Sequence, residues 1–181
     1  MTPRVRKLTL TAHVGSSVGW LGAVVCFVAL SIVGLASNDA RTVRAAYLAM
    51  ESIGWFVLVP LSLASLVTGL VQSLGTAWGL FIHYWVLAKL LINIFATIVL
   101  LMYMQTLDYL AGVAVRLPAS SDELGELRSP SPVLHAGAAL ILLLVATVLA
   151  VYKPRGITRY GARKRVRSDR SRRGPYEHSS V

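Results

Sequence analysis

The sequence contains few charged residues. Only 14% of its 181 residues are Asp, Glu, Lys or Arg, whereas a soluble domain carries about a quarter. So little charge cannot cover a water-facing surface, which argues against a soluble globular domain. The single cysteine, Cys26, cannot form a disulfide within the chain, so cysteine use leaves the redox compartment open.

The motifs of many enzymes and metal sites are also missing. The chain has no internal repeat, heptad array or glycine-rich nucleotide loop, and no HxxxH, HExxH or CxxC spacing. A closed zinc site is therefore not indicated. No nucleophile stands with a base and an orienting group, so whether the chain is an enzyme stays open.

Long apolar stretches are what the sequence does have. They cover about 11–36, 45–74, 82–105 and 133–152. About 20 apolar residues in a helix cross the ~30 Å hydrocarbon core of a bilayer. We therefore predict an all-α, polytopic membrane protein with a four-helix transmembrane bundle over residues 13–152.

The charges gather at the two ends of the chain. Residues 1–12 carry three bases and no acid, and residues 153–181 carry ten bases against two acids. Positive charge beside apolar helices stays in the cytoplasm. We therefore expect a protein of the cell (plasma) membrane with both termini on the cytoplasmic side and a long outer loop at 107–132. The tail 153–181 is expected to be disordered. A cleaved signal peptide is disfavoured, because the first apolar run exceeds the ~7–15 residues of a signal core.

The helix expected over 45–74 has the clearest periodic signal. At 3.6 residues per turn, polar and small residues fall on one stripe, which should face the bundle interior because polar groups turn away from lipid. The stripe consists of Glu51, Trp55, Leu58, Ser62, Ser65, Gly69 and Gln72. Pro60 lies on the other side and is expected to kink the helix.

Small residues predict packing faces on the first and last helices, because they let a neighbouring helix approach closely. On the first helix this face is Gly15, Gly19, Gly22 and Cys26, with His13, Ser16, Ser17 and Trp20 on the opposite side. On the last helix it is His135, Ala138, Ala139, Leu142, Ala146 and Ala150.

Two ionisable residues, Glu51 and Lys89, stand inside the apolar stretches. Such residues are costly in lipid and usually functional, although Lys89 could instead extend to the headgroups. Glu51 and His135 are expected to meet near the outer surface, where nearby methionines make a copper site one hypothesis. These are Met50, Met102 and Met104. Their alternative role is ordinary apolar packing.

Histidines near the cytoplasmic side suggest a second kind of site. His13 and His83 stand on the first and third helices, where two neutral imidazoles could bracket a haem iron in the bundle core. The alternative is that both are interfacial residues within aromatic belts. The neighbouring aromatic residues are Trp20, Tyr84 and Trp85.

The basic tail offers a lipid-binding surface. Its clustered bases are Arg163, Lys164, Arg165, Arg167, Arg170, Arg172 and Arg173. Beside a membrane, each basic residue gains about 1 kcal/mol from anionic lipid, although the same charges also serve as a topology signal. Nucleic acid is not expected as a partner, because only Tyr160 and Tyr176 offer stacking surfaces there.

Three segments, at 18–23, 43–51 and 83–90, resemble an uncharacterised bacterial family of four-helix integral membrane proteins. The resemblance covers roughly residues 8–106. More distantly, the chain is similar to CopD-like copper-resistance membrane proteins and to HemJ-type protoporphyrinogen oxidases. This similarity adds an expectation about individual residues.

The HemJ-type pattern has a histidine on the first helix, a tryptophan seven positions later and a glycine two further on, which His13, Trp20 and Gly22 match. Its third helix carries a tryptophan with a lysine one turn later, which Trp85 and Lys89 match. The resemblance implies that His13 and Lys89 lie near a porphyrin or metal. HemJ-type proteins carry a further histidine along the third helix. This chain has none there, which speaks against a simple transfer of oxidase activity.

Three functions therefore remain open. The first is a membrane protein associated with haem b or a porphyrin, with His13 as ligand, His83 as second ligand, Trp20 nearby and Lys89 holding a propionate. The second is a non-catalytic scaffold whose tail binds anionic lipid or a membrane or cytoplasmic partner. The third is copper handling at the outer face by Glu51 and His135. The sequence does not determine the substrate or whether the chain forms a homo-oligomer.

Overall fold

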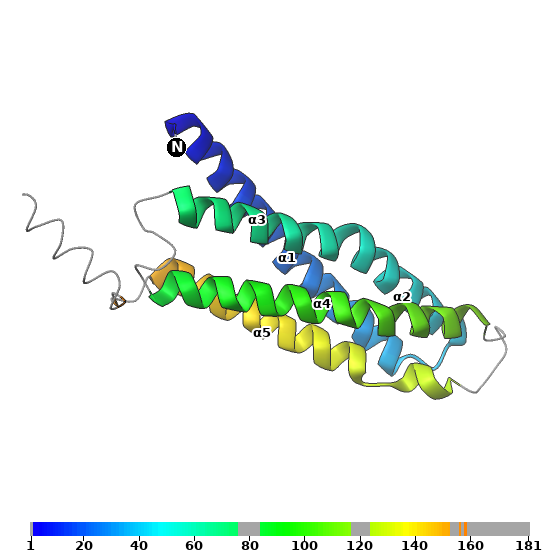
Figure 1. Cartoon of the computed structure of the whole chain (residues 1–181). Helices are drawn as coiled ribbons and strands as arrows, with labels where there is room; N and C mark the ends of the chain where they lie inside the picture. The colour runs from blue at the N-terminus through cyan, green and yellow to red at the C-terminus, as the bar shows by residue number, and fades with distance from the viewer. Residues whose placement is uncertain (1, 76–83, 117–123, 153–155, 157, 159–181) are drawn as a thin grey trace, which may run out of the picture.

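The molecule is a bundle of long helices (Figure 1). The structure, a computed structural model, describes residues 2–75, 84–116, 124–152, 156 and 158. Its elements are α1 (Pro3–Ala36), α2 (Ala40–Ile53), the π-helix η1 (Gly54–Leu58), α3 (Val59–Gly75), α4 (Tyr84–Arg116), the 3-10 helix η2 (Gly125–Arg128) and α5 (Ser131–Tyr152). α2, η1 and α3 form one continuous rod, so the described residues contain four helices long and apolar enough to cross a membrane. The predicted all-α, four-helix membrane fold is confirmed.

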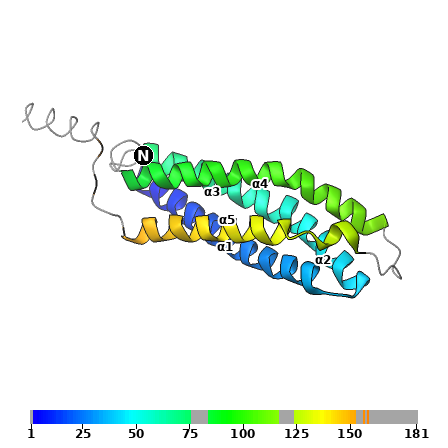
Figure 2. The same cartoon turned by 90° about the horizontal axis from the view of Figure 1, so that it is seen from below.

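The four long helices pack as a ring in which neighbours touch (Figures 1 and 2). α1 packs against the α2–α3 rod and against α5, and α4 packs against the same two. The α2–α3 rod and α5 therefore lie diagonally across the bundle. The start of α1 and the end of α5 lie at one end, here called the terminal end. The end that carries the α1–α2 link and η2 is called the connector end.

The helices extend beyond the apolar stretches that predicted them. α1 begins at Pro3 rather than near 11, because Thr2 caps it by accepting from the Val5 N–H (3.4 Å) and proline suits the first helical position. α4 continues to Arg116 rather than ending at 105, so the expected loop at 107–132 is wrong over its first ten residues. η2 and the start of α5 occupy part of its other end.

The extension of α4 has a clear physical cause. Its buried residues there are spaced at i, i+3, i+4 and i+7, which places them on one helical face. They are Leu107, Leu110, Ala111 and Ala114. α2 buries Val43, Ala46, Tyr47 and Met50 at the same spacing, and the two faces pack together.

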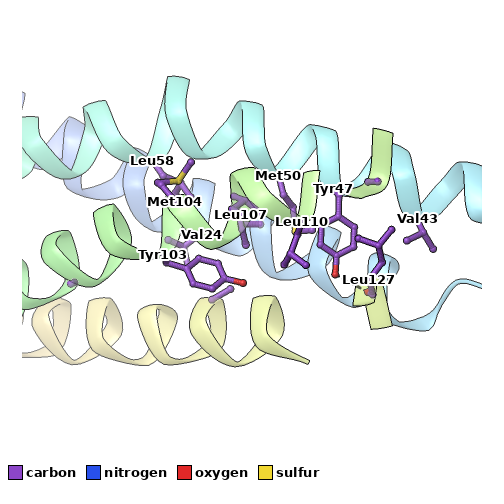
Figure 3. Packing of buried hydrophobic residues seen from close by; sticks show 14 of the residues in the cluster. Val24, Val43, Tyr47, Met50, Leu58, Tyr103, Met104, Leu107, Leu110 and Leu127 are labelled. Carbon is purple, nitrogen blue, oxygen red and sulfur yellow. Dashed lines mark hydrogen bonds between the residues drawn. The ribbon is translucent and has the colours of Figure 1, made fainter. Parts of the chain in front are cut away.

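This packing forms a connector-end core, which Figure 3 shows from close by. The Tyr47 hydroxyl donates to the Leu127 carbonyl at 2.7 Å within it. Arg128 closes the same end by donating to the Leu35 carbonyl (3.1 Å) and to Asn38 Oδ1 (2.6 Å). The core residues from α2, α4 and the segment that begins just before η2 are Val43, Tyr47, Met50, Leu107, Leu110, Ala114, Leu124 and Leu127.

Pro60 alters the α2–α3 rod in the way its chemistry demands. Proline has no N–H to donate, and its ring crowds the carbonyl four residues earlier. The chain accommodates this by widening into the π turn η1, where the Val59 N–H donates to the Gly54 carbonyl. Glycine at position 54 lets α4 pack closely against this turn, because a Cβ there would lie 2.8 Å from Met104 Sδ.

Two of the predicted packing faces are wrong. Gly15 and Gly22 have open space where a Cβ would stand and Cys26 is exposed, so only Gly19 of this predicted face packs closely, with its Cβ position 3.3 Å from Leu61 Cδ1. α1 packs mainly through other residues. Its buried residues are Ser16, Trp20, Val24, Phe27, Ser31 and Gly34. α5 buries Pro132, Ala136 and Leu143. The face that they form is rotated about the helix axis from the predicted alanine-rich face. α5 packs against α1 and α4.

Asp39 caps α2, and this cap gives stability a dependence on pH. The Thr42 hydroxyl (2.6 Å), then the backbone N–H groups of Arg41 and Thr42, donate to its carboxylate and hold its pKa below the ordinary value of 3.8. A depressed pKa contributes stability that is present above 3.8 and lost as pH falls through the folded-state value.

As pH falls from about 5 to about 2.5, the Asp39→Asn variant is therefore expected to lose less thermal stability than the wild type. Asparagine still caps the helix but does not titrate. Thermal unfolding in detergent, followed by circular dichroism, measures this difference. Asp39→Ala should lose stability at every pH, and an identical pH profile for Asp39→Asn and wild type would contradict the assignment.

Candidate functional site

A cluster of polar side chains joins α1, α3 and α4 in the half of the bundle nearer the terminal end. Ser17 Oγ lies 2.8 Å from Ser65 Oγ, and Asn93 Nδ2 donates to the same Ser65 oxygen at 3.2 Å. His13 Nδ1 lies 3.1 Å from the Ser65 carbonyl and 3.2 Å from Thr68 Oγ1. These five residues are called the polar cluster. Ser65 is its hub, and it is almost fully buried.

The sequence pattern explains why these groups meet. Ser65 lies on the predicted interior stripe. Leu58 and Ser62 on that stripe are buried as expected, whereas Trp55 is 44% exposed, so the prediction fails there. In lipid, polar groups find partners on other helices. Each buried side-chain nitrogen and oxygen of the described residues has a hydrogen-bond partner. Thr68 lies beside the stripe, so the periodicity alone did not select it.

The His13 ring is held in one orientation. A carbonyl oxygen can only accept, so Nδ1 carries the hydrogen that it donates to Ser65. In the neutral ring the lone pair is then on Nε2. Gly69 lies directly against the ring, because a Cβ there would be 2.9 Å from His13 Cε1. Any larger residue at position 69 would therefore have to displace the ring.

Lys89 lies on α4, on the other side of the same region. Its Nζ is 4.8 Å from the centroid of the Trp85 ring, which is within cation–π range. Two of the residues expected near a porphyrin, His13 and Lys89, thus lie in the same half of the bundle, on α1 and α4. Trp20 is 2% exposed and belongs to the hydrophobic core, and His83 lies outside the described residues.

The contacts of the described residues do not join Glu51 and His135, the two residues expected to bind copper. Glu51 is on α2 and His135 is on α5. His135 stacks on Tyr103 with ring centroids 4.2 Å apart, and its Nδ1 lies 3.0 Å from the Ser131 carbonyl. No group of three or more His, Cys, Asp or Glu side chains in the described part of the chain could hold a metal ion.

The methionines expected beside that site have other roles. Met50 and Met104 are buried in the hydrophobic core, while Met102 is 68% exposed. Met50 and Met104 therefore contribute to apolar packing, which is the alternative role predicted for these methionines. Met102 faces outward. The tail residues expected to bind lipid lie outside the described residues. They are Arg163, Lys164, Arg165, Arg167, Arg170, Arg172 and Arg173.

Comparison of the chain with protein-family models, with curated proteins and with solved structures gives no match. The fold and the polar cluster define a four-helix membrane protein with a hydrogen-bonded histidine between its helices.

Proposed function

We propose that the chain is a haem- or porphyrin-associated membrane protein with His13 as the ligand residue. The observation that supports this most is the Nδ1 contact with the Ser65 carbonyl. Ligating histidines commonly donate their second ring N–H to a carbonyl, which fixes the ring and makes the other nitrogen a better ligand. A porphyrin iron at Nε2 would supply redox chemistry or ligand binding.

Lys89 has a supporting role in this proposal. A lysine is a compact point charge that binds carboxylates, so Lys89 would pair with a propionate near His13. Both residues stand at similar height on α1 and α4, because His13 contacts Thr68 and Asn93 contacts Ser65 on the shared neighbour α3. We further propose that both termini are cytoplasmic. Reporters fused at residues 120 and 175 should then report opposite compartments.

The visible spectrum tests the haem proposal. The detergent-purified chain, expressed with ample haem, is expected to show a Soret band that His13→Ala abolishes. His135→Ala is the matched control, because His135 is also a histidine on a long helix but lies on Tyr103 outside the polar cluster. No Soret band in wild type, or an unchanged band in His13→Ala, would overturn the proposal.

A non-catalytic scaffold is the second candidate. It is favoured by the polar cluster itself, because each contact from Ser65 links two helices and interhelical hydrogen bonds hold membrane bundles together. On this reading His13 completes the network and binds no cofactor. The same spectrum discriminates, since a scaffold carries no chromophore under any expression condition.

A further inference from the structure

The first turns of α1 form an exposed basic segment, residues 3–12, that the haem proposal does not use. Every residue from Pro3 to Ala12 is exposed except Thr9, and the first buried residue of α1 is Ser16. The segment carries three bases, at positions 4, 6 and 7, and no acid. Its apolar side chains at positions 5 and 8 are 48% and 71% exposed. These side chains therefore face lipid or solvent.

Contacts between helices fix the height of this segment. α1 and α3 run antiparallel and His13 contacts Thr68, so Lys7 stands level with the last turn of α3. α4 also runs antiparallel to α3, and Asn93 contacts Ser65. The first residue of α4, at position 84, is therefore level with the same turn. Three bases and no acid stand on α1 at and beyond this level, so we infer that the terminal end leaves the hydrocarbon here.

Aromatic residues support that boundary. Tyr84 is 55% exposed, and exposed tyrosines of membrane proteins concentrate at the headgroup level. Gly156, just after α5, lies against the Tyr84 ring, since a Cβ there would be 3.5 Å from its Cδ2. Gly156 therefore lies near the same height along the bundle as Tyr84 and Lys7.

The two ends of the described structure differ in charge. At the connector end, acids and bases are mixed: Asp39, Arg41, Arg44, Glu51, Asp108, Arg116, Glu126 and Arg128. At the terminal end the described ionised residues are Arg4, Arg6, Lys7 and Lys89. Charge complementarity therefore favours an anionic partner at the terminal end, at headgroup height.

We propose that residues 3–12 bind anionic phospholipid headgroups of the leaflet at the terminal end. Leu8 lies just inside the level of Lys7, against the upper acyl layer, and Val5 lies one turn further out, among the headgroups. Arg4, Arg6 and Lys7 extend their apolar stems along this boundary and place their charges among the phosphates. Basic side chains beside an apolar helical face are the usual composition of such a surface.

Lipid retention by the purified full chain tests this surface. The protein in detergent is titrated with phosphatidylglycerol or phosphatidylcholine, and bound lipid is counted by native mass spectrometry. Wild type should prefer phosphatidylglycerol. Each basic residue near an anionic surface strengthens binding by roughly fivefold, so the triple variant Arg4→Gln, Arg6→Gln, Lys7→Gln should lower this preference at least tenfold.

Two matched variants make the result specific. Arg41→Gln, Arg44→Gln, Arg116→Gln removes the same charge at the connector end and should keep the preference. The variant Arg170→Gln, Arg172→Gln, Arg173→Gln removes the same charge from the tail. It should keep most of the preference for phosphatidylglycerol. Full preference in the α1 variant would overturn the proposal, as would its loss in the tail variant alone. Displacement of the lipid by inorganic phosphate at equal concentration would also overturn it, because the site would then be one for a soluble anion.

Discussion

Leu107→Ala is expected to lower the free energy of unfolding by about 2–5 kcal/mol. The Leu107 side chain is completely buried where α4 meets α2, and its removal leaves a cavity beside Gly54, whose Cβ position is 3.4 Å from Leu107 Cδ2. Denaturant unfolding in detergent, followed by circular dichroism, measures the change.

Leu101→Ala is the control on the same helix. Leu101 is 40% exposed, so the same truncation should cost well under half as much. Equal losses in the two variants would contradict the assignment of residues 107–116 to a packed helix. An unchanged stability in Leu107→Ala would do so as well.

Gly69→Val is expected to displace His13 and to destabilise the protein by roughly 1–3 kcal/mol. Even the first added carbon would stand 2.9 Å from His13 Cε1, and the ring cannot yield without giving up its contact with Ser65. Thermal stability in detergent is the measurement. Under the haem proposal, the same variant should also lose its Soret band.

Gly22→Val is the matched control, because a Cβ at Gly22 would meet nothing within 4 Å. It should leave both stability and spectrum close to wild type. A Gly69→Val protein as stable as the Gly22→Val protein would show that the imidazole does not rest on Gly69. A Soret band kept at full intensity in Gly69→Val would argue against His13 as the ligand.

The sequence was sufficient for the number of spanning helices, because hydropathy depends on composition alone. It also identified the interior stripe at Leu58, Ser62 and Ser65, since one periodicity governs a whole helix. It missed the end of α4 because Asp108 and Arg116 make that segment look like a loop. The spacing of Leu107, Leu110 and Ala114 was the available signal.

The packing faces and the site depend on information that one sequence does not contain. A small residue permits close approach but does not require it, so the glycines of α1 could not show that Trp20 and Phe27 would be the packed side chains. The contact between His13 and Gly69 depends on how far α1 slides along α3. Many weak contacts set that offset together, and no local motif records it.

The lengths of the helices carry one more consequence. The 33 residues of α4 measure about 50 Å, while the hydrocarbon layer is ~30 Å thick. With the terminal end leaving the hydrocarbon near Lys7, as we propose, the excess length lies in water at the connector end, where α2 exposes Arg41. Expulsion of water drives apolar surfaces together there, whereas between helices in lipid that force is absent. On this placement, water rather than lipid holds together the connector-end core, where Val43, Met50 and Leu107 are completely buried.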